Sequence, residues 1–360
     1  MRIAGRLMGT HTTPRSLPTD SDVESRCRRR HGQPASQHRP SVGLPSTLSE
    51  GKKMRNPLPT WIVGVALATS FSTSSAQTLA APLSGTLKKL ADTGTIALGV
   101  RENQVPFAYV DDNQKVIGFT VDICKALVDS LKADAGIKAL QVELKPVTAQ
   151  TRLALLGNGT IDLDCASVSN NAERQKQVSF SNTFFLTATA FAAKKSSNLK
   201  SIADLAGKTV VAVPGTNHMV ILNEMNQKQN LNMRIVSAKD QPEAFLMLST
   251  GRAAALVSDD VLLASVIASA KNPEDYLISP DILTPPAPYG LVMRRDDPQF
   301  KAAVDKALTA YLTSPAAKAN YDKWFVHPIP PRGLRMNFPM SAALKKAYAK
   351  PTDSIDLTAY

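Results

Sequence analysis

The stretch TIALGVRENQVPFAYVDDNQKVIGFTVDICKALVDSLK, residues 95–132, decides the fold class because its hydrophobic periodicity changes along its length. Residues 95–101 and 105–110 form apolar runs that are typical of β-strands. From Gly118 to residue 132 the apolar side chains return every three or four positions, which predicts an α-helix. A strand followed by a helix is the first unit of an α/β fold.

The same alternation continues through the rest of the chain. Further strands are expected at residues 140–146, 161–166, 188–194, 208–213, 233–237, 254–257 and 289–294. Further helices are expected at residues 150–156, 202–205, 217–227, 241–250, 259–268, 298–311 and 315–324. Strands separated by helices predict an α/β fold with a mostly parallel sheet.

The order of these segments predicts two lobes, since residues 77–360 exceed what one hydrophobic core usually fills. We expect residues 77–190 to form the first part of lobe 1 and residues 191–290 to form lobe 2. Residues 291–360 would return to lobe 1 and end as a C-terminal tail. Two strands would then cross between the lobes as a hinge, and a ligand would bind in the cleft.

Residues 54–76 have the features of an export signal. A positive start precedes the mostly apolar run WIVGVALATSF (61–71), and small residues precede a cleavage site after Ala76. The run is too short to span a membrane as a helix, which needs about 20 apolar residues. Residues 1–53 are rich in Arg, Ser, Pro and His; either translation starts at Met54, or these residues are a disordered basic extension.

The charge distribution does not support a nucleic-acid partner for the whole chain. The sequence has 42 Lys and Arg against 30 Asp and Glu, a formal net charge of +12. The first 76 residues hold 11 of the basic and 4 of the acidic side chains. The remainder therefore has a net charge of only +5, so charge alone does not indicate nucleic-acid binding.

The cysteines and histidines predict no metal site. Beyond residue 76 they are Cys124, Cys165, His218 and His327, and their spacing lacks the close pairs that hold zinc. Neither glycine-rich nucleotide motif occurs, so we expect no cofactor. In an oxidising compartment Cys124 and Cys165 could form a disulfide; otherwise they would be small buried hydrophobic side chains.

Short motifs occur in a specific order between residues 95 and 338. They are GVRE (99–102), VPF (105–107), GFTVD (118–122), TR (151–152), NGTID (158–162), NNAERQKQ (170–177), PGT (214–216), AKD (238–240), GRA (251–253), DD (259–260), DKWF (322–325) and PIPP (328–331). In this order they resemble the periplasmic solute-binding proteins of polar amino-acid ABC transporters, and most strongly their glutamate/aspartate-binding branch. The resemblance implies a two-lobed periplasmic binding protein fold, type II-like, with two hinge strands between the lobes.

The charges of an amino-acid ligand match residue types at the predicted strand ends. A buried carboxylate or ammonium needs opposite charges and hydrogen bonds. Arg174 follows a strand-to-helix junction rich in capping residues, and residues 214–216 form a similar junction in the other lobe. Free backbone N–H groups at such junctions favour an anion.

The resemblance assigns these residues roles in ligand binding. It implies that Arg174 binds the ligand α-carboxylate with help from Ser169 and Thr216. Ser167 and Asp259 match the positions that bind the α-ammonium. Asp259 could instead be the N-cap of the helix that follows it.

Arg101 and Arg152 favour an acidic ligand. In the acidic branch the matching arginines face the side-chain carboxylate, and two guanidinium groups aimed at one pocket would repel each other without an anion. Ala149 and Gln241 depart from the branch, which usually has Ser and His at these positions. Each change alters a hydrogen-bond donor, so another acidic or amide-bearing ligand stays open.

We therefore expect a periplasmic, monomeric binding protein that captures glutamate or aspartate and delivers it to an inner-membrane ABC permease, without catalysis. One alternative is a dehydratase-like enzyme on the same fold, with His218 as its acid–base group. Others are a binding protein for glutamine or asparagine and a sensory or adhesion module.

Overall fold

The computed structural model of the protein describes residues 82–360. The predicted export signal at residues 54–76 and the upstream residues 1–53 lie outside the described residues. No helix within residues 82–360 combines the length and the apolar character needed to cross a membrane.

A five-stranded mixed sheet forms the centre of the first lobe. Its strands, in spatial order, are β5 (Gln141–Pro146), β1 (Thr95–Val100), β6 (Leu163–Asp164), β15 (Val292–Arg294) and β7 (Val178–Phe180). β5, β1 and β6 are parallel, whereas β15 is antiparallel to β6 and β7. Every residue of β1 after Thr95 is buried, as expected for a strand covered on both faces.

A second five-stranded mixed sheet forms the centre of the other lobe. Its strands, in spatial order, are β11 (Arg234–Ser237), β10 (Thr209–Ala212), β12 (Ala255–Asp259), β9 (Thr189–Lys194) and β13 (Tyr276–Ile278). β11, β10 and β12 are parallel, and β9 is antiparallel to β12 and β13. The expectation of mostly parallel strands is confirmed for strand direction: in each sheet four of the five strands run the same way. The reversed strands are β15 and β9, each of which follows a crossing between the lobes.

Helices cover both sheets. The first lobe contains α1 (Gly85–Thr93), α2 (Phe119–Asp134), α3 (Arg152–Gly157), α4 (Ala172–Gln175), α8 (Pro298–Leu312), α9 (Pro315–Phe325) and α10 (Ala342–Ala349). The second contains α5 (Asn217–Lys228), α6 (Gln241–Ser249) and α7 (Asp260–Ala268). Single 3-10 turns occur at Lys195–Ser197, Ile202–Leu205, Pro273–Asp275 and Leu357–Ala359.

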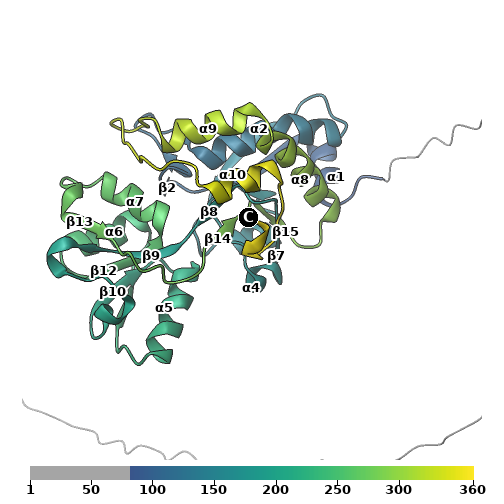
Figure 1. Ribbon diagram of the computed structural model, residues 1–360. Coiled ribbons are helices and arrows are strands. Elements are labelled where there is room, and N and C mark those ends of the chain that lie inside the picture. The colour runs from purple at the N-terminus through teal and green to yellow at the C-terminus, as the bar shows by residue number, and fades with distance from the viewer. Residues whose placement is uncertain (1–81) are drawn as a thin grey trace, which may run out of the picture. The chain divides into compact units, whose positions relative to one another are not determined.

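Two crossing strands connect the lobes, as the hinge prediction required. β8 (Phe185–Thr187) leads into the second lobe, β14 (Ala287–Tyr289) leads back, and the two pair antiparallel (Figure 1). The rings of Phe185 and Tyr289 stack with centroids 5.9 Å apart, and both side chains are fully buried in the core of the first lobe. The hinge strands are therefore anchored in that core.

A short three-stranded sheet, β2 (Asn103–Gln104), β3 (Ala108–Val110) and β4 (Val116–Ile117), extends the first lobe toward the pocket. The predicted extended run at residues 105–110 was wrong for its first half, which is a turn between β2 and β3. Pro106 has no N–H to donate to a strand ladder, and the N–H of Phe107 closes the turn onto the Gln104 carbonyl at 2.8 Å.

The start of α2 depends on a glycine. Gly118 has a φ of 142°, and a Cβ added there would lie 2.1 Å from the carbonyl oxygen of Phe107, so no larger residue fits where the helix meets the turn. The helix then buries a face with a four-residue spacing, Phe119, Ile123, Leu127 and Leu131. Cys124 on this helix and Cys165 after β6 form a disulfide, with Cα atoms 6.2 Å apart.

The end of the chain is folded onto the first lobe. Residues 342–349, to which the sequence analysis assigned no helix, form α10. Leu344, Ala347 and Tyr348 of this helix are buried in the core of the first lobe. The hydroxyl groups of Tyr360 and Thr183 lie 2.7 Å apart, so the chain end is held against the segment that precedes the hinge.

Candidate functional site

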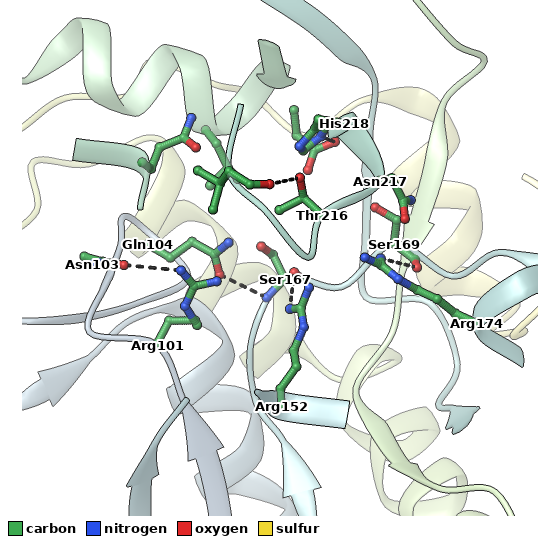
Figure 2. Close-up of a pocket in the computed structure, with 14 residues that line it drawn as sticks. Arg101, Asn103, Gln104, Arg152, Ser167, Ser169, Arg174, Thr216, Asn217 and His218 are labelled. Carbon is green, nitrogen blue, oxygen red and sulfur yellow. Dashed lines mark hydrogen bonds and ion pairs between the residues drawn. The ribbon is translucent and has the colours of Figure 1, made fainter. Parts of the chain in front are cut away.

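One polar pocket contains all eight residues proposed from the sequence. They are Arg101, Arg152, Ser167, Ser169, Arg174, Thr216, Gln241 and Asp259. Arg101 follows β1, Asp259 ends β12 and Gln241 begins α6, whereas Ser167 and Ser169 lie in the loop between β6 and α4. In Figure 2 the labelled arginines and serines of the first lobe face Thr216 and His218 of the second. The structure thus brings these residues together, and their roles toward a ligand stay predictions.

Arg101 and Arg152 form a buried basic wall. Their side chains are 6% and 3% exposed. Burial and the neighbouring charge of Arg152 lower the pKa of Arg101 to about 10, and burial lowers the pKa of Arg152. Arg152 donates to the Ser167 carbonyl at 3.3 Å, and Arg101 donates to Asn103 Oδ1 at 3.5 Å. An anion between the two guanidinium groups would offset the free-energy cost of burying their charges and would reduce their mutual repulsion.

Asp164 provides part of the counter-charge and was missed as a site residue. It is fully buried at the end of β6, with Oδ2 3.9 Å from Arg152 Nε. Burial raises the pKa of Asp164, while the charges of Arg152, Arg101 and Arg174 oppose this. Neither carboxylate oxygen has a hydrogen-bond partner among residues 82–360. No sequence signal separated it from Asp162, which binds Lys89 Nζ at 2.7 Å and the Ala97 N–H at 2.8 Å.

Arg174 connects the two lobes. Its guanidinium donates to the carbonyl of Ser169 at 3.1 Å and to the carbonyl of Gly215, in the second lobe, at 3.3 Å. Its backbone N–H donates to Asn171 Oδ1 at 2.9 Å, which fixes the first turn of α4. Burial and the charge of Arg152 lower the pKa of Arg174 to about 10. Arg174 is thus a third cation directed toward the same space.

Asp259 is the acidic group of the pocket. It precedes α7, but its side chain caps no helix N–H. Its Oδ2 accepts a hydrogen bond from the Tyr289 hydroxyl at 2.5 Å, and its Oδ1 lies 3.1 Å from His218 Nε2. Burial would raise the pKa of Asp259, but His218, Tyr289 and Arg174 outweigh it and hold the pKa below its usual value. These contacts therefore favour the ionised form of Asp259, which occupies the N-cap position of α7 without a capping side-chain hydrogen bond.

Several further residues line the pocket. Asn103, Gln104, Val213, Asn217 and Leu262 were not singled out from the sequence, and His218 was considered only for an enzyme. Gln104 Oε1 accepts from the Ser167 N–H at 3.4 Å. Gln241 Oε1 accepts from the Ser258 hydroxyl at 3.3 Å, which leaves Nε2 buried and unpartnered within the described residues. That amide is available to a ligand oxygen.

The charged groups of the pocket indicate which ligand chemistry it could accept. Among residues 82–360 no group of three or more His, Cys, Asp or Glu side chains could hold a metal ion. What the arrangement offers is three guanidinium groups for carboxylates and one carboxylate for an ammonium. These are the complementary charges of a small zwitterion that has an additional acidic group.

Two hinged lobes around a charged pocket form the architecture of a protein that closes over a small ligand. Residues 96–327 match the family of bacterial extracellular solute-binding proteins, family 3, and the chain belongs to this family.

Relatives in this family extend the comparison. The chain is 43% identical over 289 residues to the glutamate/aspartate import solute-binding protein of Escherichia coli, covering 80% of this chain and 95% of that protein. It is 45% identical over 282 residues to the L-glutamate/L-aspartate-binding protein of Pseudomonas aeruginosa, covering 78% and 92%. A solved ancestral arginine-binding protein with bound arginine is 28% identical, with a TM-score of 0.58 over 64% of this chain and 98% of its own.

Proposed function

We propose that this protein binds L-glutamate or L-aspartate and delivers it to an ABC transporter for import. The single observation that supports this most directly is the convergence of three arginines, two of them buried, and one buried aspartate on one pocket between the lobes. Two similar proteins, both more than 40% identical, are named for binding these two amino acids. No chemical step is required, because closure of the lobes around the ligand is itself the signal to the permease.

In this proposal each ligand group has its own partners. The α-carboxylate binds Arg174, the hydroxyl of Ser169 and the N–H of Thr216. The α-ammonium binds Asp259 and the Ser167 hydroxyl, which is buried without a hydrogen-bond partner in the described part of the chain. The side-chain carboxylate lies between Arg101 and Arg152, with Gln241 Nε2 as an additional donor.

A calorimetric and thermal-shift panel tests the proposal. L-glutamate, L-aspartate, L-glutamine and L-asparagine are titrated in parallel; a ligand at a hundred times its Kd stabilises the fold by about 2.7 kcal/mol. We expect the two acidic amino acids to bind at least tenfold more tightly than the two amides. Equal binding of the amides would favour the glutamine- or asparagine-binding alternative.

Substitutions separate the two carboxylate sites. Arg174→Ala should abolish binding of all four amino acids, because each has an α-carboxylate. Arg152→Ala should weaken the acidic ligands much more than the amides. Arg252→Ala, at an exposed arginine in the second lobe, is the control and should bind as the unchanged protein does. Equal losses for acidic and amide ligands in Arg152→Ala would contradict the assignment of the side-chain site.

We also propose that the protein acts in the periplasm after removal of residues 54–76. Its two lobes are divided near residues 190 and 290. Cell fractionation and the intact mass of the exported chain test the location and the cleavage. A mature chain that begins at Gln77 is the expected result, and retention in the cytoplasm would contradict it.

The enzyme alternative has no support from the reported relatives, which are named as binding or import proteins. His218 nevertheless lies in the pocket, so its contacts call for a different explanation.

A further inference from the structure

His218 lies in the pocket at the place where a ligand ammonium is expected. It is in the first turn of α5, its side chain is 6% exposed, and its Nε2 lies 3.1 Å from Asp259 Oδ1. Figure 2 shows it beside Thr216 on the second-lobe side of the pocket. His218 and a ligand ammonium therefore compete for the same carboxylate.

The Nε2 atom of His218 lacks a hydrogen-bond partner among the described residues. Its approach to Asp259 lacks hydrogen-bond geometry, and its Nε2 is buried with no other partner within residues 82–360. Tyr289 occupies the other oxygen of Asp259 at 2.5 Å. A buried donor of this kind normally has a partner, and the open space beside it is the ligand pocket. The ring can therefore serve a ligand atom as well as Asp259.

The charge balance of the pocket changes with the protonation of His218. The titratable and charged groups around the pair of His218 and Asp259 are Arg152, Arg174, Asp260 and Tyr289. With Asp164 and Asp259 ionised, the three pocket arginines leave one positive charge, which a glutamate anion balances. Protonation of His218 raises the net charge of the pocket to two positive charges. A dicarboxylate without an amino group has two negative charges and balances them. Histidine is the side chain whose charge ordinarily changes between pH 5 and 8.

We propose that His218 substitutes for the ligand ammonium, so that this site also binds C4 and C5 dicarboxylates that lack an amino group, with uptake of one proton. The inference rests on the proposed function, since it uses the same arginines for both carboxylates. The imidazolium then pairs with Asp259 through Nε2, in place of the ligand ammonium. The matching probe is 2-oxoglutarate, which has the carbon skeleton of L-glutamate with an oxo group in place of the ammonium.

Calorimetry at several pH values tests the proposal. The affinity for 2-oxoglutarate should rise by up to about tenfold per pH unit as the pH falls from 8 to 6, because binding takes up a proton. The affinity for L-glutamate should not rise over this range, because protonated His218 competes with its ammonium. Titrations in phosphate and Tris, which differ in ionisation enthalpy, should give proton uptake approaching one for 2-oxoglutarate, and no uptake or a net release of protons for L-glutamate.

Variants test whether the proton taken up with 2-oxoglutarate binds to His218. In His218→Asn the proton uptake should vanish, and the ratio of 2-oxoglutarate to L-glutamate affinity at pH 6 should fall at least tenfold. His327→Asn, at the exposed histidine outside the pocket, should keep both values. If His218→Asn does not fold, the measurements on the unchanged protein still decide.

Three results would overturn the inference: no binding of 2-oxoglutarate at millimolar concentration, pH-independent binding, or an unchanged affinity ratio in His218→Asn. If L-glutamate and L-aspartate fail to bind while 2-oxoglutarate binds with proton uptake, the proposed function is wrong and the role of His218 stands.

Discussion

Asp164 is a buried carboxyl group beside the arginines of the pocket, two of which, Arg101 and Arg152, are themselves buried. Its carboxylate is fully buried beside Arg152 and makes no hydrogen bond with the described residues, so its contribution is charge alone. Asp164→Asn keeps the shape but leaves the arginines without this counter-ion. Breaking a buried ion pair from one side costs about 3–5 kcal/mol, and we expect the free energy of unfolding in urea, without ligand, to fall by this amount.

A matched control and a ligand titration sharpen this test. Asp281→Asn, at an exposed aspartate of the second lobe, should leave the free energy of unfolding within about 0.5 kcal/mol. Saturating L-glutamate should recover more stability in Asp164→Asn than in the unchanged protein, because the ligand then supplies the missing negative charge. An Asp164→Asn protein as stable as the control would mean that the carboxyl group is not an ionised counter-ion.

At this scale the sequence predicted the composition of the pocket better than its internal bonding. Polar residues at strand ends, such as Arg101 and Asp259, are recognisable because strand ends of an α/β sheet gather at one edge. Asp164 falls within the strand expected at residues 161–166, and the partner of a buried carboxylate becomes visible only once the strands are assembled. The hydrogen bond from Tyr289 to Asp259 spans 30 residues, and no local pattern encodes it.

Among the elements, the turn between β10 and α5 lies against the backbone of the opposite lobe. Gly215 has a φ of 75°, and a Cβ there would lie 2.8 Å from the backbone of Ala149. Gly215→Ala would therefore obstruct the approach of the lobes, in addition to the cost of about 1–2 kcal/mol for a side chain in the left-handed region. We expect at least a tenfold loss of affinity for L-glutamate in calorimetry.

Gly251 is the control that separates backbone strain from the clash between the lobes. It has nearly the same φ, 77°, with no atom within 4 Å of an added Cβ. Gly251→Ala should lower thermal stability as much as Gly215→Ala does and leave the affinity unchanged. Equal affinities in the two variants would show that the turn does not limit closure.

The disulfide joins two elements of the first lobe, α2 and the segment after β6. It closes a loop with a sequence separation of 41, which in the chain-entropy model stabilises the fold by about 4 kcal/mol. The double variant Cys124→Ala with Cys165→Ala should lose about this much in urea unfolding while its affinity for L-glutamate changes less than threefold, because neither cysteine lines the pocket. A large loss of affinity would mean that the disulfide positions Asp164, its chain neighbour.

Elements with a long, regular hydrophobic pattern were predictable, and short ones were not. The strand expected at residues 95–101 and the helix from Gly118 match β1 and α2 within two residues. The strand expected at residues 161–166 is shorter in the structure, where it is β6, because only two of its residues pair with β1. The sequence analysis assigned α10 to the tail, although its buried residues follow helical spacing.

For the two lobes together, closure depends on a few hydrogen bonds. Asn103 Nδ2 donates to Asp240 Oδ2 at 2.6 Å, and Asn171 Nδ2 donates to Asn217 Oδ1 at 3.2 Å. Arg174 adds its bond to the Gly215 carbonyl. Each such bond contributes only about 1 kcal/mol, so the closed arrangement needs the ligand charges as well. Ligand binding should therefore shift the population from open to closed, visible as a smaller radius of gyration in solution scattering.

Asn103 allows the contribution of one contact between the lobes to be tested. Its bond to Asp240 exists only when the lobes meet, so Asn103→Ala should speed ligand dissociation about fivefold, the equivalent of about 1 kcal/mol. The association rate should not change, because the ligand enters before the hydrogen bond between Asn103 and Asp240 forms. Asn113→Ala, at an exposed turn position of the same lobe, is the control in stopped-flow measurements. An unchanged dissociation rate in Asn103→Ala would mean that the ligand alone holds the lobes together, and that the contact between Asn103 and Asp240 contributes nothing to the closed state.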